Sequence, residues 1–407
     1  MEHLRTADFD YELPPELIAQ TPIEPRDQAR LLIARRGSGV PSAGPGQVLE
    51  HRRFHELPGL LRPGDLLVMN ESRVIPARLL GRKEGEGGAA IEVLLLRERE
   101  PGLWEALVRR ARRLKVGDRI VFGPASSPAL GEGWVEGETL TATLEDVLPS
   151  GARLLRLSDA VTWERLGQVP LPPYIHAPLA DLERYQTVYA RPKGSVAAPT
   201  AGLHFTPVLL ERLRARGVEL AFLTLHIGWD TFRPVTEADP SRHKLMREWC
   251  SIPAATVGRL RAARREGRRI VAVGTTACRA LEWAADHILT TSSPSIGEGR
   301  SEGAPVRPAP VEGPHSSGLA NPQLASGSGP IEGWADLLIL PGHRFRLVDA
   351  LITNFHLPRS TLLMLVSAFA GQALGPAAGR DLVLNAYAEA VRQRYRFYSF
   401  GDAMLVL

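Results

Sequence analysis

The chain shows two different patterns of hydrophobic and polar positions, each in its own part of the sequence. From Asp65 to Leu157, short apolar runs alternate with Gly and Pro, as in DLLVMN, RVIPARLLGR, IEVLLLR and DRIVFG. Closely spaced short strands of this kind predict a small antiparallel β-barrel or sandwich. After Pro170, segments with helical spacing alternate with apolar strands, and this alternation predicts an α/β layer. We therefore expect an α/β main domain, residues 1–64 and 158–407, interrupted by a small antiparallel β-barrel domain at 65–157.

Two segments define the ends of individual elements. Thr206 and Pro207 are typical of a helix start, because Thr accepts a capping hydrogen bond and Pro fits the first turn, and Gly217 marks the end of that helix. Near the C-terminus, NAYAEAVRQRYRF has helical spacing, and YSFGDAMLVL predicts a closing strand within a sheet.

The segment 289–330 shows neither the short-strand pattern nor the helix-strand alternation. More than half of its residues are Gly, Ser or Pro, and large apolar side chains are few, which is typical of a flexible insertion. It contains GRSEG at 299–303, which matches the GxSxG pattern of serine hydrolases. That chemistry needs the serine on a strained turn between a strand and a helix, so we reject this interpretation.

Composition narrows the class of protein. The chain has 407 residues, 44% hydrophobic and 23% charged, with a formal net charge of +4, so it is globular and a polyanionic partner is permitted but not required. Cys250 and Cys278 stand alone, which argues against a disulfide scaffold or a cysteine-based zinc site. Without an apolar signal segment or a run long enough to span a bilayer, we expect a cytoplasmic protein with no membrane partner.

A first candidate site is the segment PTAGLHFT, residues 199–206, immediately before the predicted helix. Free amides and the helix dipole at a helix N-terminus favour an anionic group. Gly202 permits close approach of a ligand to the backbone, and His204 titrates near neutrality. The alternative is that Thr206 is an ordinary cap and His204 a packed loop residue.

A second candidate site is the turn Gly274-Thr275-Thr276, between an apolar strand and a helix that carries Arg279 and Glu282. A strand, a turn of small residues and a helix form a natural anion cradle, and the Arg279 guanidinium suits a carboxylate or phosphate. Alternatively, Arg279 pairs with Glu282 across one helical turn. The spacing GxGxxG is absent, which counts against a dinucleotide-binding fold.

A third group lies at the ends of two other predicted strands. His226 ends AFLTLHIG, and Asn354 and His356 follow another strand in ITNFHLP. Ligands of α/β sheets bind at strand ends. The separations of His204, His226 and His356 match no metal-ligand spacing, so we expect no metal.

The run LVRRARRLK, residues 107–115, places five cations in the barrel segment. Arg109, Arg112, Arg113 and Lys115 would contact the phosphates of a nucleic acid, or they protect a solvated edge strand. Arg73 and Arg78 either extend this basic surface or enter the active site.

Read together, these segments resemble the S-adenosylmethionine:tRNA ribosyltransferase-isomerase family of the queuosine pathway. The resemblance spans nearly the whole chain and includes FDYELPPELIAQTPIEPRDQARLL, NESRVIPARLLGRK, PLPPYI, VAAPTAGLHFT, LTLHIGWDTFRPV, VGTTACRALE, ITNFHLPRSTLLMLVSAFAG and YRFYSFGDAML. It implies transfer and isomerisation of the ribosyl group of S-adenosylmethionine onto 7-aminomethyl-7-deazaguanine at the tRNA wobble position. The products would be epoxyqueuosine, adenine and methionine. The methionine compound would be a consumed substrate, with no other cofactor.

This chemistry requires a base for a ribose proton next to the sulfonium and an acid for adenine departure. The candidates are His204, His226, His356 and Asp402. For the methionine end we expect Gly274, Thr275, Thr276, Arg279 and Glu282, with Thr200, Gly202, Asn354, Arg73 and Arg78 as further substrate contacts. The modified base would stack on Tyr174 or Phe205. The partners would be S-adenosylmethionine and tRNA, bound by a monomer.

Two positions depart from the family pattern. Asp230 stands where the family commonly has glycine, and Met246 replaces the inner histidine of a two-histidine pattern that retains His243 and Glu248. They motivate a second hypothesis, a non-catalytic tRNA-binding paralogue. A third, a methyltransferase, would give S-adenosylhomocysteine instead of adenine and methionine.

Overall fold

The computed structural model describes residues 4–36, 49–85, 88–109, 114–123, 139–159, 162–228, 235–290 and 329–407. Their centre is a mixed sheet of nine strands in the order β15-β13-β12-β3-β14-β16-β17-β1-β2. The strands are β1 (Arg30–Ala34), β2 (Glu50–Arg53), β3 (Leu66–Asn70), β12 (Glu219–Leu225), β13 (Glu248–Ile252), β14 (Ile270–Val273), β15 (Ile331–Ala335), β16 (Ala350–Asn354) and β17 (Ala403–Val406).

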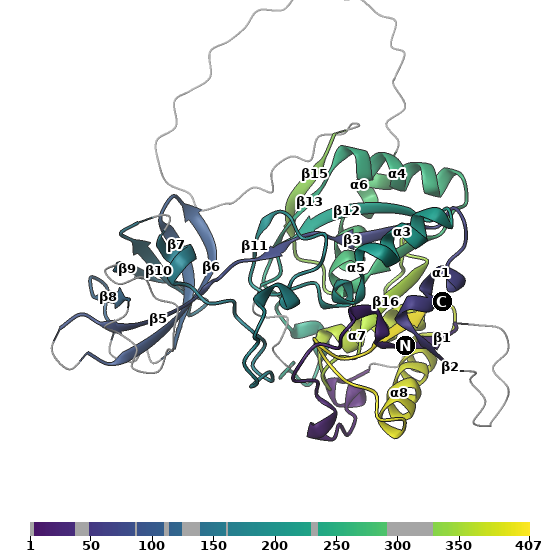
Figure 1. Cartoon of the computed structure of the whole chain (residues 1–407), viewed down its shortest axis with the longest axis horizontal. Helices are drawn as coiled ribbons and strands as arrows, with labels where there is room; N and C mark the ends of the chain where they lie inside the picture. The colour runs from purple at the N-terminus through teal and green to yellow at the C-terminus, as the bar shows by residue number, and fades with distance from the viewer. Residues whose placement is uncertain are drawn as a thin grey trace, which may run out of the picture.

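Both faces of this sheet are covered, so alternate residues of the same strand face two separate cores (Figure 1). Leu66 and Val68 of β3 belong to the larger core, whereas Leu67 and Met69 belong to the smaller one. On the larger core pack α4 (Ala254–Arg265), α5 (Gly274–Trp283), α6 (Ala285–Leu289), α7 (Thr361–Ala370) and α8 (Pro376–Arg392). On the smaller core pack α1 (Leu57–Leu60), α3 (Pro207–Ala215) and the short 3₁₀ helix Thr200–His204.

Local sequence signals explain where helices begin. The Oγ1 atom of Thr206 accepts a hydrogen bond of 3.1 Å from the amide of Leu209, and Pro207 is the first residue of α3. The predicted start of this helix is therefore confirmed. Ser360 caps α7 in the same way, with Leu363 donating at 3.2 Å.

The second body is a closed barrel of six strands in the order β10-β7-β6-β5-β8-β9. They are β5 (Arg78–Lys83), β6 (Ala90–Glu100), β7 (Leu103–Arg109), β8 (Arg119–Phe122), β9 (Leu140–Val147) and β10 (Arg153–Leu157), and neighbours pair antiparallel. The barrel lies to the left of the α/β body in Figure 1. An α/β main body interrupted by a small antiparallel barrel is the fold that the sequence predicted.

The two chain segments that connect the α/β body and the barrel pair as short parallel strands, β4 (Arg73–Val74) and β11 (Lys193–Ser195). The helix α2 (Thr162–Leu166) follows the barrel. The strand Leu66–Asn70 falls within the 65–157 segment that the sequence analysis gave to the barrel, but it pairs with β12 and β14 in the nine-stranded sheet. The barrel strands begin only at Arg78. We retain the two-domain division as a proposal, with the first boundary moved to this point.

The strand β17 lies inside the sheet, antiparallel to β16 and parallel to β1. The prediction that YSFGDAMLVL contributes a strand to a sheet is confirmed for residues 403–406. The predicted flexible insertion at 289–330 lies outside the described residues from 291 to 328. Across the described ranges, no helix combines the length and apolar character needed to cross a membrane.

Candidate functional site

The loops that carry most candidate residues meet at one edge of the sheet. The strands β12, β3, β14 and β16 are mutually parallel, so their carboxyl ends lie at the same edge. His226 follows β12, Gly274 follows β14, and Phe355 follows β16. Ligand sites of α/β proteins form at this edge.

One pocket at this edge joins the two corners that the sequence singled out. Thr200, from the segment 199–206, and the turn Gly274-Thr275-Thr276 line it together with the loop after β16. The lining residues with side chains able to bind or stack are Tyr174, Thr200, Thr275, Thr276, Thr353, Asn354, His356, Tyr398 and Ser399. We call this space the corner pocket.

The helix α5 presents its N-terminus to the corner pocket. Gly274 has a φ of +88°, which glycine adopts without strain, and the strand turns directly into the helix there. The first-turn amides of a helix favour an anionic group. Thr276 adds a buried hydroxyl, Oγ1, that has no hydrogen-bond partner among the described residues. The pocket therefore offers both amide and hydroxyl donors to a ligand.

His356 lines the corner pocket directly and is held on two sides. Its Nε2 atom lies 2.8 Å from the hydroxyl of Thr353, and its backbone amide donates to the hydroxyl of Tyr387 at 2.9 Å. Burial lowers the pKa of His356 to about 3. The imidazole is therefore neutral at pH 7, in the form that accepts a proton.

His204 lies behind the wall of the corner pocket and connects to it through Asn354. The Asn354 amide nitrogen is 3.4 Å from Nε2 of His204, and its oxygen accepts from the Thr200 hydroxyl at 2.9 Å. His204 also packs on Phe54, with ring centroids 4.9 Å apart. Burial lowers its pKa to about 4, although the charge of Asp402 acts in the opposite direction.

Asp402 stabilises the loop before β17 through hydrogen bonds and an ion pair. Its carboxylate accepts hydrogen bonds from the amides of Arg30 and Arg396, both at 2.8 Å, and it pairs with the Arg30 guanidinium at 3.1 Å. Only 1% of its surface is exposed. Its charge acts on His204, whose pKa it raises against the effect of burial.

His226 lines a neighbouring cavity between the barrel and the sheet, described further below. The adjacent residue Ile227 lines both this cavity and the corner pocket. The imidazole packs on Gly194, where an added Cβ would lie 2.8 Å from the ring. Burial lowers the pKa of His226 to about 4, and Nδ1 has no hydrogen-bond partner in the described part of the chain.

The two aromatic candidates differ in accessibility. Tyr174 lines the corner pocket, packs on Tyr398 with ring centroids 4.7 Å apart, and bonds the Ser399 hydroxyl at 2.7 Å. Phe205 is fully buried against Phe54 and has no surface for stacking on a ligand. Gly202 also faces inward, because an added Cβ would meet the hydroxyl of Tyr189 at 2.1 Å. Its small size serves packing.

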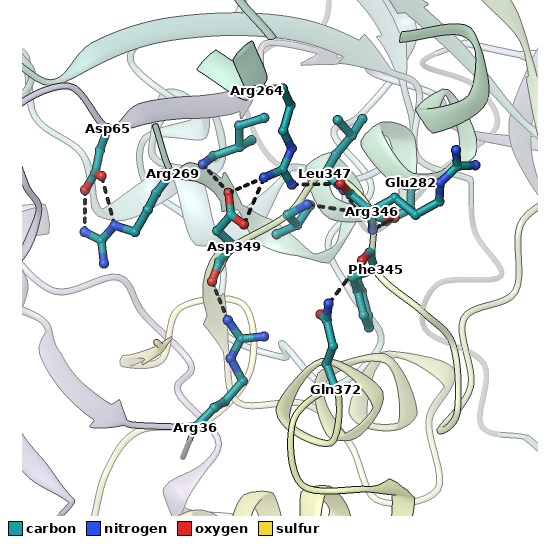
Figure 2. A network of polar contacts seen from close by, with 12 residues as sticks. Arg36, Asp65, Arg264, Arg269, Glu282, Phe345, Arg346, Leu347, Asp349 and Gln372 are labelled. Carbon is teal, nitrogen blue, oxygen red and sulfur yellow. Dashed lines mark hydrogen bonds and ion pairs between the residues drawn. The ribbon is translucent and has the colours of Figure 1, made fainter. Parts of the chain in front are cut away.

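Arg279 and Glu282 have different partners from those the sequence offered. Arg279 forms a buried ion pair with Glu248 of β13, and its pKa is lowered to about 10 by burial, so it stays charged at pH 7. The Glu282 carboxylate accepts from the backbone amides of Arg346, Leu347 and Val348 at 2.8–3.0 Å. Figure 2 shows this carboxylate directed at the loop of residues 345–349, which it holds against α5.

The basic candidates lie away from the corner pocket. Arg73 pairs with Glu183, and Arg78 bonds Glu92 at 2.9 Å on the barrel. Arg109 and Lys115 are exposed on the barrel. Arg112 and Arg113 lie outside the described residues, as does Asp230.

Four contributors were not predicted from the sequence: Thr353, Tyr398 and Ser399 in the corner pocket, and Glu248 as the partner of Arg279. Tyr398 has a φ of +69°, a conformation that residues other than glycine rarely adopt and that concentrates at functional sites. This strain has no signature in the sequence. For Glu248, the family pattern around His243 was the available signal.

Comparisons with known proteins give one consistent picture. A family model described as "Queuosine biosynthesis protein" matches residues 6–406. A curated protein of Symbiobacterium thermophilum is 48% identical over 99% of this chain and 100% of its own length, and one of Moorella thermoacetica is 47% identical at the same coverage. Both are named S-adenosylmethionine:tRNA ribosyltransferase-isomerase. A crystal structure from Thermotoga maritima, described as an S-adenosylmethionine tRNA ribosyltransferase, is 37% identical, with a TM-score of 0.47 and coverage of 98% of this chain and 100% of that one.

Proposed function

The chain belongs to the queuosine biosynthesis protein family, and from this premise we propose that its corner pocket binds S-adenosylmethionine. The protein is an enzyme that transfers and isomerises the ribosyl group of S-adenosylmethionine onto tRNA in queuosine biosynthesis. The observation that carries the proposed site is the convergence of Thr200, the Gly274–Thr276 turn and His356 in one pocket at the strand ends.

The methionine end of the donor suits the N-terminus of α5. Its carboxylate would accept hydrogen bonds from the first-turn amides and from the hydroxyl of Thr276, which has no partner among the residues that the structure describes. We assign Arg279 an indirect role at this end, because its guanidinium is already paired with Glu248 and does not reach the carboxylate as a free donor. Tyr174 and Tyr398, in contact at the pocket wall, offer ring faces to a purine.

The chemistry begins with removal of a proton from the ribose carbon next to the positively charged sulfur, which acidifies it. His356 is the imidazole that lines the pocket, and we assign this proton to it by position. It is neutral at pH 7, although its lowered pKa also makes it a weaker base than a free imidazole. The resulting imidazolium can return the proton to adenine as the bond between ribose and base breaks, so no proton is gained or lost. His204 is the second candidate for these transfers, and it reaches the pocket through Asn354.

The remaining assignments rest on the nature of the substrates. We propose that tRNA carries 7-aminomethyl-7-deazaguanine at the wobble position and contacts exposed cations of the barrel. S-adenosylmethionine is consumed, and we assign no further cofactor. Because both substrates are cytoplasmic, we place the reaction there, carried out by a monomer.

The test is product analysis by mass spectrometry. Purified protein is incubated with S-adenosylmethionine and tRNA bearing the aminomethyl base, and we expect adenine and methionine. S-adenosylhomocysteine would instead identify a methyltransferase, and tRNA binding without any product would favour the non-catalytic paralogue.

The same assay tests the pocket. His356→Ala should reduce adenine release at least about tenfold, as expected for loss of a proton-transfer group. The control is His287→Ala, because His287 is exposed on α6, away from the corner pocket. Equal rates in these two variants would remove His356 from the chemistry.

A further inference from the structure

A cavity of about 800 Å³ lies between the barrel and the edge of the nine-stranded sheet. One wall comes from the barrel strands β6 and β7 and from α2. The other comes from β13, β15 and the residues after β12, and β11 adds Lys193 and Gly194. We call this space the interdomain cavity. Ligand sites commonly measure 300–1,000 Å³, so its size suits a nucleotide.

Each wall of the interdomain cavity carries a pair of tryptophans. On the barrel side, Trp104 and Trp163 are in edge contact with ring centroids 4.9 Å apart. On the sheet side, Trp249 and Trp334 are directly paired across β13 and β15, with centroids 5.4 Å apart. Trp249 and Trp334 are only half-buried, so part of each indole is open to a planar ligand, although the Arg97 guanidinium covers one face of Trp334. Stacking on such side chains is how proteins hold unpaired nucleobases.

Two side chains that line the cavity carry polar atoms without a hydrogen-bond partner among the described residues. Nδ1 of His226 and Nε1 of Trp104 are buried and make no hydrogen bond within the described residues. Both atoms are covered by protein here, but their side chains line the cavity. Because buried polar atoms are nearly always paired, this wall favours a ligand with hydrogen-bonding edges. A nucleobase has such edges around a stacking face.

The charges of the lining are mixed. Arg97, Arg99, Lys193 and Arg247 are balanced by Glu98, Glu105, Glu164 and Glu248. The Arg97 guanidinium also lies over the Trp334 ring at 4.5 Å, which joins the two walls. A nucleotide with an anionic phosphate and a basic aminomethyl group presents charges of both signs. Within the protein, Arg97 and Arg99 pair with Glu105 and Lys193 pairs with Glu164, so the wall of the cavity presents charges of both signs to such a ligand.

The interdomain cavity lies next to the corner pocket. Ile227 lines both spaces, and the neighbouring His226 faces the interdomain cavity. A ribosyl group leaving a donor in the corner pocket therefore has an acceptor site next to it. This continuity is required by any direct transfer between two bound substrates.

We infer that the interdomain cavity receives the acceptor nucleobase of the tRNA, turned out of the anticodon loop and stacked on Trp249 and Trp334. The inference rests on the proposed function, and it assigns the acceptor to a different space from the donor. It replaces Phe205, which is buried, as the stacking surface for this base. His226 then lies at the junction of the two substrates.

The experiment compares two anticodon stem-loop RNAs that differ only at the wobble position, one bearing 7-aminomethyl-7-deazaguanine and one abasic. Affinity for each is measured with the wild type and with Trp334→Ala, Trp249→Ala and Trp249→Phe. We expect the alanine variants to lose about tenfold in affinity for the base-bearing RNA and to bind the abasic RNA as the wild type does. Trp249→Phe should retain most of the affinity, because an aromatic face remains.

A second set of variants fills the cavity without removing a ring. Met246 lines the cavity and is 37% exposed, so Met246→Trp is compatible with folding, and Val208→Trp places the same bulk on exposed α3. Met246→Trp should weaken binding of the base-bearing RNA alone, and Val208→Trp should change neither affinity. S-adenosylmethionine binding without RNA should be the same in all variants.

Equal losses on both RNAs, or no loss on either, would overturn the inference. Tighter binding of another small molecule, with RNA affinities unchanged in all variants, would identify a different occupant. Failure of the proposed function is distinguishable, because it would appear as absence of adenine release by the wild type, whichever RNA binds.

Discussion

Arg279 of α5 and Glu248 of β13 form a buried ion pair, and Glu248 also lines the interdomain cavity. The side chains are 12% and 6% exposed. One Glu248 oxygen also accepts from the amide of Gly228 at 2.8 Å. The pair thus fixes the loop after β12, which carries His226, to the helix that we propose for the donor.

Breaking this pair should be costly. Glu248→Gln leaves a buried guanidinium without its charge partner, and we expect the free energy of unfolding in urea to fall by about 3 kcal/mol. Glu389→Gln is the control, because its partner Arg392 is 68% exposed and such pairs contribute less than about 1 kcal/mol. Equal losses in the two variants would contradict the structural role of the buried pair.

The position of His226 can be tested through Gly194. An added Cβ at this residue would lie 2.8 Å from the imidazole, so Gly194→Ala should displace the ring and reduce adenine release about tenfold. Gly194 has a φ of +142°, so strain also contributes. Gly267→Ala is the matched control, because Gly267 has a φ of +66° and no atom within 4 Å of an added Cβ. If both variants lose the same activity, backbone strain explains the effect and the role of His226 is refuted.

The buried histidines predict a loss of stability in acid. The pKa values of His204 and His356 are lowered from 6.5 to about 4 and about 3 in the folded protein, mainly by burial. The unfolded chain therefore binds more protons between pH 6.5 and 4, so stability is complete above pH 6.5 and declines below it. Each histidine should lower the free energy of unfolding by about 2 kcal/mol between pH 7 and pH 5.

Urea unfolding at both pH values measures this effect. His204→Asn removes one titrating group, so the difference between pH 7 and pH 5 should shrink by about 2 kcal/mol. His287→Asn, at an exposed position, should leave the difference unchanged. An unaltered difference in the His204 variant would show that this imidazole is not kept neutral by burial.

The barrel cations predict a salt dependence. Arg109 is 65% exposed at its side chain, and Lys115 is exposed nearby in sequence. Replacing both with Ala should weaken tRNA binding and reduce the slope of log affinity against log salt by about 1.5, because fewer counterions are released. Arg392→Ala, on α8, is the control. An unchanged slope would show that these cations do not contact tRNA phosphates and would favour the alternative, that they protect a solvated edge strand.

The sequence predicted the fold wherever the signal was local. Thr206 and Pro207 set the start of α3, and the change of pattern near Pro170 separated the two bodies. The strand Leu66–Asn70 was assigned to the wrong sheet, because a buried run of four apolar residues and an asparagine fits either body. Its partners Glu219–Leu223 and Ile270–Val273 are distant in sequence, and no local pattern encodes that choice.

For the candidate site, too, local sequence signals predicted some residues, whereas contacts between distant segments were missed. Thr276 and His356 were proposed because they follow apolar strands, and Thr200 because its segment precedes a helix N-terminus. Side-chain direction was not available, so the commitment of Glu282 to the loop of residues 345–349 could not be foreseen. The strained backbone at Tyr398 also has no local signal.

The place of β17 has a consequence for how this protein is made. Arg30, which opens β1, bonds Asp402, which precedes β17, although the two are 372 positions apart. Until the residues between Arg30 and Asp402 have been synthesised, the edge of β1 that pairs with β17 stays open, because β2 covers only the other edge of β1. A chaperone that shields the emerging N-terminal segment would therefore raise the yield of this protein more than one that acts on the barrel, whose strands are all synthesised in one stretch.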